Sequence, residues 1–275
     1  MKKSVLVVLS GLALTGCVST PDADLESRNI QVDENAVPAS AAAPAGISGL
    51  VSASGPSYVT LTVSESDQKS GTPSKDARAV ALTSGSGFIV DPSGYVMTAA
   101  HVAVKPGYTV SARAANGRIY SGTVVDVLPT NDMALIKLKG FSGKAVSPTS
   151  NQCVVPGSVV YSLGKPHAQG DTARVGTLQA MHFGRPVSYG QFGYPDALVL
   201  HLGTQKGESG GPLFNQQGQL IGMVVSTLTD SNGNLLNLAH AVPAPALAGF
   251  LCSHVSCSAQ WTALAAKPTS ACPSG

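Results

Sequence analysis

The chain has 275 residues, which is enough for one large domain or two small ones. Charged residues make up 12% of it, about half the usual share, whereas 30 glycines and 18 prolines are typical of a turn-rich β protein. The net charge of +2 excludes a strong electrostatic field, and we therefore expect no nucleic-acid partner.

The first 16 residues have the pattern of a bacterial export signal. Lys2 and Lys3 precede an apolar run at 4–14, whose 11 residues are too few for a permanent transmembrane helix. The run leads into Leu-Thr-Gly-Cys at 14–17, which resembles the lipobox of bacterial lipoproteins. This resemblance implies that residues 1–16 are removed and that Cys17 carries acyl chains such as palmitate as a membrane anchor.

The residue after the cysteine bears on the membrane. In enteric bacteria an aspartate there favours retention in the inner membrane, whereas this chain has Val18. We therefore expect the outer membrane, with the protein facing the periplasm or the cell surface. The alternative is an ordinary signal peptide with a chance cysteine.

Residues 17–50 lack a hydrophobic period and are rich in Ala, Pro and Ser, so we expect a lipidated Cys17 followed by a disordered tether. Residues 51–260 carry short alternating apolar runs between turn signals, which predicts an all-β domain. Residues 241–255 predict the one helix, with prolines in its first turn, and 261–275 form a C-terminal tail.

The glycine-rich stretch at 207–211 holds Ser209 and fits two enzyme patterns. The elbow of α/β-hydrolases requires a helix after the serine, but residues 212–225 predict a hairpin around a Gln-Gln-Gly turn. The elbow is therefore excluded. The pattern G-x-S-G-G of chymotrypsin-like proteases remains, beside the reading of a purely structural turn.

Two upstream stretches supply partners for Ser209 in the chymotrypsin order of His, Asp, Ser. His101 follows Thr-Ala-Ala at the end of a predicted hairpin, and Asp132 precedes the apolar run 133–138. With the segment 161–180 and the serine loop, these motifs resemble the HtrA (DegP-like) branch of trypsin-like serine proteases over residues 57–245. Each residue alone is more often structural, but four motifs in the family order favour the enzyme.

The resemblance implies two six-stranded β-barrels, split near 145–155, with a short C-terminal helix and an active site between the barrels. It implies hydrolysis of peptide bonds in envelope or extracellular proteins by His101, Asp132 and Ser209 through an acyl-enzyme, without metal or cofactor. The amides of Gly207 and Ser209 would form the oxyanion hole.

The resemblance also places a specificity pocket just before the serine loop and on the strand that follows it. The pocket residues would be Gly203, Thr204, Val225, Ser226 and Thr227. Because no carboxylate stands among them to pair with Lys or Arg, we expect cleavage after small or medium apolar residues.

Two features depart from the HtrA pattern. About 30 residues follow the last family-like strand near Val242, too few for the PDZ domain that HtrA proteins carry. Glu208 stands where asparagine usually precedes the serine, and a carboxylate beside the oxyanion hole is unfavourable unless it finds a partner. The alternatives are a weak or inactive protease-fold lipoprotein that binds a partner protein, and a purely structural envelope lipoprotein.

The resemblance also bears on activation. In the zymogen branch of trypsin-like proteases, a newly cut N-terminal amine pairs with the acidic residue before the serine. No such N-terminus is visible here, so we expect the loops 161–180 and 203–208 to shape the oxyanion hole. A chain starting near Gly49 should then be as active as one starting at Val18, because ordering a tether costs more than one ion pair returns.

The remaining cysteines and histidines give weaker expectations. An exported chain makes two disulfides plausible among Cys153, Cys252, Cys257 and Cys272, with three pairings left open, and their spacing does not favour a metal site. The other five histidines are expected to be structural: His167, His182, His201, His240 and His254.

Overall fold

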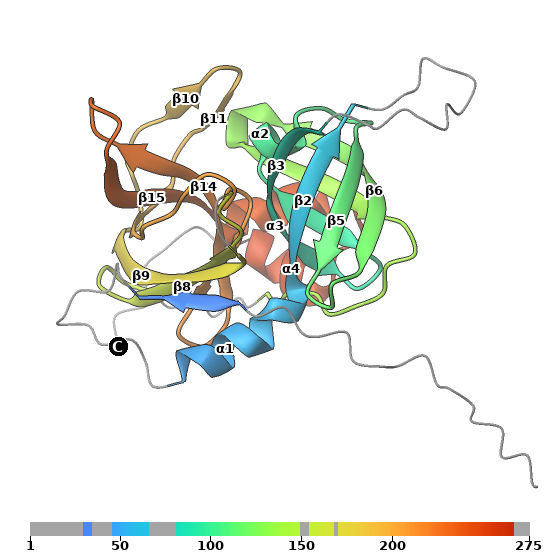
Figure 1. Ribbon diagram of the computed structural model, residues 1–275, viewed down its shortest axis with the longest axis horizontal. Helices are drawn as coiled ribbons and strands as arrows, with labels where there is room; N and C mark the ends of the chain where they lie inside the picture. The colour runs from blue at the N-terminus through green and yellow to red at the C-terminus, as the bar shows by residue number, and fades with distance from the viewer. Residues whose placement is uncertain (1–29, 35–45, 66–80, 149–153, 168–169, 267–275) are drawn as a thin grey trace, which may run out of the picture.

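A computed structural model describes residues 30–34, 46–65, 81–148, 154–167 and 170–266. Two closed barrels of antiparallel strands lie side by side, the first drawn in cyan and green and the second in yellow and orange (Figure 1). Each barrel is a ring of six strands, so the predicted fold class is confirmed.

The first barrel has the strand order β2-β3-β4-β7-β6-β5, and β2 pairs with β5 to close the ring. In β2 the apolar side chains of Val59, Leu61 and Val63 are buried while Thr62 is exposed, as the alternation of the sequence predicts. The strands are β2 (Tyr58–Ser64), β3 (Ala81–Asp91), β4 (Tyr95–Thr98), β5 (Thr109–Ala114), β6 (Ile119–Leu128) and β7 (Met133–Leu138).

The second barrel has the order β9-β12-β15-β14-β13-β8, and β8 pairs with β9 to close it. The predicted hairpin after the serine is confirmed as β13 and β14, whose turn is held by two amides that donate to Asn215 Oδ1 at 3.0 Å. The strands are β8 (Val159–Gly164), β9 (Thr172–Ala180), β12 (Leu198–His201), β13 (Pro212–Asn215), β14 (Leu220–Thr229) and β15 (Leu235–Pro243).

A small hairpin of the second barrel packs against the first barrel. It consists of β10 (Val187–Tyr189) and β11 (Phe192–Tyr194), and it rises from the second barrel toward the side of the molecule where α2 (Ala100–Ala103) lies (Figure 1). Its strand β11 packs on the short helix η2 (Pro129–Asn131) of the first barrel. The hairpin therefore reaches across the boundary between the barrels.

The helix predicted within 241–255 is confirmed as α3 (Ala244–Cys252). The expectation that it would be the one helix is wrong, because α4 (Ala259–Ala265) follows it and α1 (Ile47–Ser54) and η1 (Gly55–Ser57) precede the first barrel. Helix α4 is too short to be stable alone, but Trp261 is buried and its Nε1 donates to the Val90 carbonyl at 3.2 Å. A disulfide bond between Cys252 and Cys257 links α3 to the loop before α4.

The predicted tether is wrong over two short segments. Residues Gln31–Asp33 form β1, which pairs in parallel with β9, and residues 47–50 belong to α1, whose Ile47 is buried in the core. Three residues added to an existing sheet edge leave no periodic signal in a sequence, because the edge provides their partners. The signal peptide, Cys17, the rest of the tether, Cys153 and Cys272 lie outside the described residues.

No helix within the described ranges is both long and apolar enough to cross a membrane.

Most histidines of the described residues make side-chain contacts. His182 pairs with Asp196 at 2.7 Å, and His254 pairs with Asp126 at 2.6 Å. His254 thereby ties the end of α3 to β6 of the first barrel.

Candidate active site

His101 and Asp132 meet at one edge of the first barrel, 31 positions apart in the chain. His101 lies in α2, directly after β4, and Asp132 lies between η2 and β7 with φ at +47°. The Asp132 carboxylate is fully buried and lies 2.8 Å from His101 Nδ1, while its other oxygen accepts the His101 backbone N–H at 3.0 Å. Because a carboxylate only accepts, Nδ1 carries the proton and Nε2 is the basic nitrogen.

The Ser209 loop packs directly against this edge. The Ser86 amide in β3 donates to the Ser209 carbonyl at 2.9 Å, and the Gly210 amide donates to the Val224 carbonyl at 2.7 Å. Gly210 has φ at +84°, and a Cβ there would lie 2.2 Å from the Ser86 carbonyl and 2.3 Å from Thr98 Oγ1. Only glycine allows the loop from the second barrel to come this close to β3 and β4.

Ser209 itself is half-buried, and its hydroxyl forms no hydrogen bond with another described residue. A serine nucleophile often pairs with its base only when a substrate is bound. The structure therefore brings the Ser209 loop to the histidine's edge of the first barrel and leaves the hydroxyl available.

Two backbone amides of the loop are also available. Neither the Gly207 amide nor the Ser209 amide donates a hydrogen bond within the described part of the chain. The carbonyl group that shares a peptide bond with each of these amides accepts a hydrogen bond. The Lys206 carbonyl, next to the Gly207 amide, accepts from the His167 amide at 3.0 Å, and the Glu208 carbonyl, next to the Ser209 amide, accepts from the Gly211 amide at 3.0 Å. In a trans peptide the C=O and N–H point in opposite directions, so these bonds set where both amides point.

Glu208 does find a partner, and its side chain is buried under the loop. Its carboxylate accepts from Arg174 Nε at 2.9 Å and from the Gln205 amide. Burial raises the pKa of the Glu208 carboxyl, and the Arg174 guanidinium opposes this. The charge that stands next to the serine in sequence is therefore neutralised by an arginine of β9.

Tyr189 was missed in the sequence analysis. This residue of β10 donates its hydroxyl to Asp132 Oδ2, and the hydroxyl lies 3.4 Å from His101 Nδ1. Its ring and that of Phe192 both meet the His101 ring edge-on, with centroids at 5.8 and 6.3 Å. Burial and the Asp132 carboxylate raise the pKa of Tyr189, so the hydroxyl stays protonated and remains a donor.

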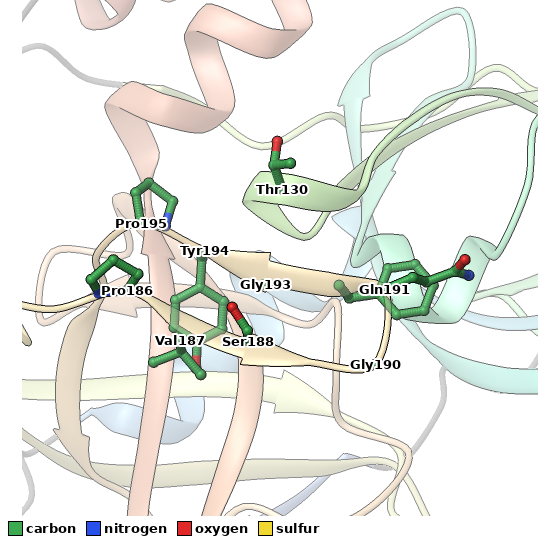
Figure 2. A pocket seen from close by; sticks show the side chains of 10 residues that line it. Thr130, Pro186, Val187, Ser188, Gly190, Gln191, Gly193, Tyr194 and Pro195 are labelled. Carbon is green, nitrogen blue, oxygen red and sulfur yellow. The ribbon is translucent and has the colours of Figure 1, made fainter.

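A pocket of about 330 Å³ lies between this hairpin and the first barrel. Figure 2 shows Pro186 and Pro195 at the base of the hairpin, Gly190 at its tip, and Thr130 of η2 across the gap. The lining is mostly apolar. The pocket shares Phe192 with the surroundings of His101, so it adjoins the catalytic candidates.

The predicted specificity residues fall into two groups. Thr204 and Thr227 lie together, with their hydroxyls 2.7 Å apart, and Thr204 is buried. Ser226 instead pairs with the Tyr194 hydroxyl at 2.8 Å, and that hydroxyl lies 2.7 Å from Nδ1 of the buried His240. Burial lowers the pKa of His240 and raises that of Tyr194 to about 12, so this cluster is neutral around pH 7.

Val225 is buried in β14, and Gly203 lies beside Asn237 of β15, since a Cβ at Gly203 would be 3.3 Å from Asn237 Oδ1. No carboxylate is among the hydrogen-bond partners of the five predicted pocket residues in the described structure. Tyr194 and His240 were not predicted to stand beside them, because they come from strands distant in sequence.

Comparisons with known proteins agree with this geometry. Residues 85–223, half of the chain, match the family model of the trypsin-like peptidase domain. The chain is 32% identical over 163 residues to the putative serine protease HhoB of Synechocystis sp., which covers 58% of this chain and 37% of that protein. It is 30% identical over 159 residues to a probable periplasmic serine endoprotease, DegP-like, of Chlamydia pneumoniae, and the match covers 58% of this chain and 32% of that protein. The chain thus spans roughly a third of the length of these relatives.

Solved structures share the fold. The Rv3671c protease in its inactive form superposes with a TM-score of 0.59 at 22% identity, over 76% of this chain and 95% of that one. An HtrA-type protease solved with a tripeptide superposes with a TM-score of 0.64 at 22% identity, over 77% of this chain and 64% of that one. At this identity the likeness supports the two-barrel fold.

Proposed function

This chain belongs to the family of trypsin-like peptidases, and from that premise we propose that it is a serine endopeptidase of the HtrA type. The observation that carries the proposal is the buried Asp132 on His101 Nδ1, at the edge where the Ser209 loop docks. Envelope or extracellular proteins are the proposed substrates, and the reaction needs no cofactor.

The mechanism follows from the roles of the side chains. Ser209 Oγ attacks the carbonyl carbon of the scissile peptide while His101 Nε2 takes the hydroxyl proton. The resulting oxyanion accepts hydrogen bonds from the Gly207 and Ser209 amides, which stabilise it by about 2.7–4 kcal/mol each. The C–N bond then breaks as His101 passes the proton to the leaving amine, which leaves an acyl-enzyme on Ser209.

Water completes the cycle. His101 Nε2 takes a proton from the water, whose oxygen attacks the acyl carbon, and the proton returns to Ser209 Oγ as the carboxylic acid leaves. Asp132 keeps the proton on Nδ1 throughout and stabilises the imidazolium in each transition state.

The proposal is tested with Ser209→Ala. This variant should hydrolyse casein or a peptide about 10⁴-fold more slowly than the wild type and should not react with a fluorophosphonate probe. His201→Ala, which changes a half-buried histidine outside the site, should remain active and labelled. A wild type that stays unlabelled, or turns over within tenfold of Ser209→Ala, would show that the chain is not a serine protease.

The alternative of a protease-fold protein that only binds a partner predicts such an inert wild type. Glu208 was its sequence basis, because an unpartnered carboxylate would oppose an oxyanion. The contact with Arg174 weakens that basis, since the buried carboxylate is paired with a guanidinium and accepts the Gln205 amide. The probe experiment decides between the two.

The place of action is part of the proposal. The motif at 14–17 supports acylation of Cys17, and several acyl chains would anchor the protein at about 0.8 kcal/mol per buried CH₂. We place the enzyme at the outer membrane, facing the periplasm or the cell surface.

The proposed specificity is for small or medium apolar residues before the scissile bond. The proposed pocket residues carry only hydroxyl and apolar side chains, and Glu208, the acid of the serine loop, is paired with Arg174. A lysine or arginine of the substrate would therefore be buried without a counter-charge.

A further inference from the structure

A buried arginine links the N-terminal strand to the serine loop. Arg174 lies within β9 and is 5% exposed. Its Nε donates to Glu208 at 2.9 Å, and its Nη1 donates to Asp33 of β1. Figure 1 shows β1, in blue, along the yellow β9 at the lower edge of the second barrel. Three segments far apart in the chain thus meet at one guanidinium.

Glu208 transmits this contact to the catalytic loop. One carboxylate oxygen holds Arg174 and the other accepts the Gln205 amide, while the Glu208 amide donates to the Gln205 carbonyl at 3.2 Å. The side chain and the backbone amide of Glu208 therefore both bond to Gln205 and close the turn 205–208. Gly207 lies inside that turn and Ser209 follows it, so the turn determines where the two available amides stand.

Asp33 in turn fixes the guanidinium. Arg174 Nη2 is buried and has no hydrogen-bond partner among the described residues, so Glu208 and Asp33 are the two anchors that set its orientation. Asp33 belongs to a strand of three residues at a sheet edge, and the strand is held by pairing with β9 and by the Gln31 amide, which donates to the Asp171 carbonyl at 3.0 Å. Such an edge is among the least stable parts of a fold.

We propose that Arg174 is a positioning residue for the oxyanion loop and that β1, through Asp33, keeps it in place. The proposal rests on the proposed protease function. The internal guanidinium then does for Glu208 what a new N-terminal amine does in the zymogen branch. The proposal predicts, against the earlier expectation, that a chain starting near Gly49 is less active than one starting at Val18, because the shorter chain lacks Asp33.

The first test compares two neighbouring acids in the full chain. Asp33→Ala should lower kcat about tenfold with KM within twofold, and should slow fluorophosphonate labelling of Ser209 by a similar factor. Glu34→Ala is the matched control, because Glu34 is exposed and has no partner among the described residues. It should leave kcat, KM and labelling unchanged.

A shortened chain gives a second, independent readout. A protein starting at Gly46 keeps α1 and both barrels but lacks β1, and it should lose kcat as Asp33→Ala does. A synthetic peptide of residues 28–36 added in trans should restore turnover with saturation, whereas the same peptide with Asp33→Ala should not. This rescue separates a positioning role from a general loss of stability.

The charge pair is tested last. Arg174→Met should lower both the melting temperature and kcat, since it leaves Glu208 buried and unpaired. Adding Glu208→Gln should recover the melting temperature while kcat stays low, because the loop has lost its anchor. If Asp33→Ala and the shortened chain both had the kcat of an active wild type, this inference would be wrong, while the proposed protease function would stand. A wild type that the probe does not label would overturn the proposed function and this inference with it.

Discussion

Replacing Tyr189 by phenylalanine removes one oxygen atom from the catalytic neighbourhood and leaves its packing intact. The ring keeps its edge-on contact with His101 and its contacts with Phe192 and Tyr194. The lost group is the hydroxyl that donates to Asp132 Oδ2. Asp132 is fully buried, so the variant removes a hydrogen-bond donor from a carboxylate that has no exposed surface.

The magnitude follows from the type of bond. A hydrogen bond to a charged group contributes about 1.5–3 kcal/mol, and each 1.36 kcal/mol of transition-state stabilisation is a factor of ten in rate. The Tyr189→Phe variant should therefore lower kcat about 10- to 150-fold. The His101 contacts to Asp132 at 2.8 and 3.0 Å remain, so the loss should stay well below the roughly 10⁴-fold cost of replacing the aspartate by asparagine.

The assay is steady-state hydrolysis of a peptide together with the rate of fluorophosphonate labelling. KM should stay within twofold, because the hydroxyl is bonded to Asp132, and labelling should slow with kcat. Tyr120→Phe is the matched control, since the Tyr120 ring packs on Phe141 and its hydroxyl has no hydrogen bond in the described structure. A kcat for Tyr189→Phe within twofold of the wild type, with an unchanged melting temperature, would refute the role assigned to Tyr189.

Three further results are expected. Cys17→Ser should abolish incorporation of labelled palmitate in cells, and any acyl label on that variant contradicts the lipobox interpretation. A peptide library should show cleavage after Val or Ala, and dominant cleavage after Lys or Arg would refute the proposed pocket. Burial lowers the pKa of His240, so the unfolded chain protonates this imidazole more readily than the folded chain does. The free energy of unfolding should therefore keep its full His240 contribution above about pH 6.5 and should decrease as the pH falls below that value. His240→Asn should flatten this acid loss of melting temperature between pH 7 and pH 5, whereas His201→Asn should not.

Much of the fold was predictable from local pattern. Alternating apolar residues in 57–63 mark a strand that buries one face, whereas the continuous apolar run at 133–138 marks a strand that is buried on both faces; glycine-rich turns mark the ends of strands. The order of His101, Asp132 and Ser209 was visible because each stands in a short motif next to a strand. Helix α4 and strand β1 were not predictable, since each is too short to carry a periodic signal and depends on burial against a distant partner.

The sequence by itself determined which residues could act as nucleophile, base and orienting acid, because those motifs are local. Only the tertiary structure decided what surrounds them. Tyr189 reaches Asp132 across 57 positions, and Arg174 joins Asp33 across 141 positions. Nothing in the neighbourhood of either residue in the chain marks it, since these contacts arise when the barrels close and the hairpin and the edge strand pack against them. A hydrogen-bond partner for a buried charge is chosen by proximity in space, and a sequence shows proximity only along the chain.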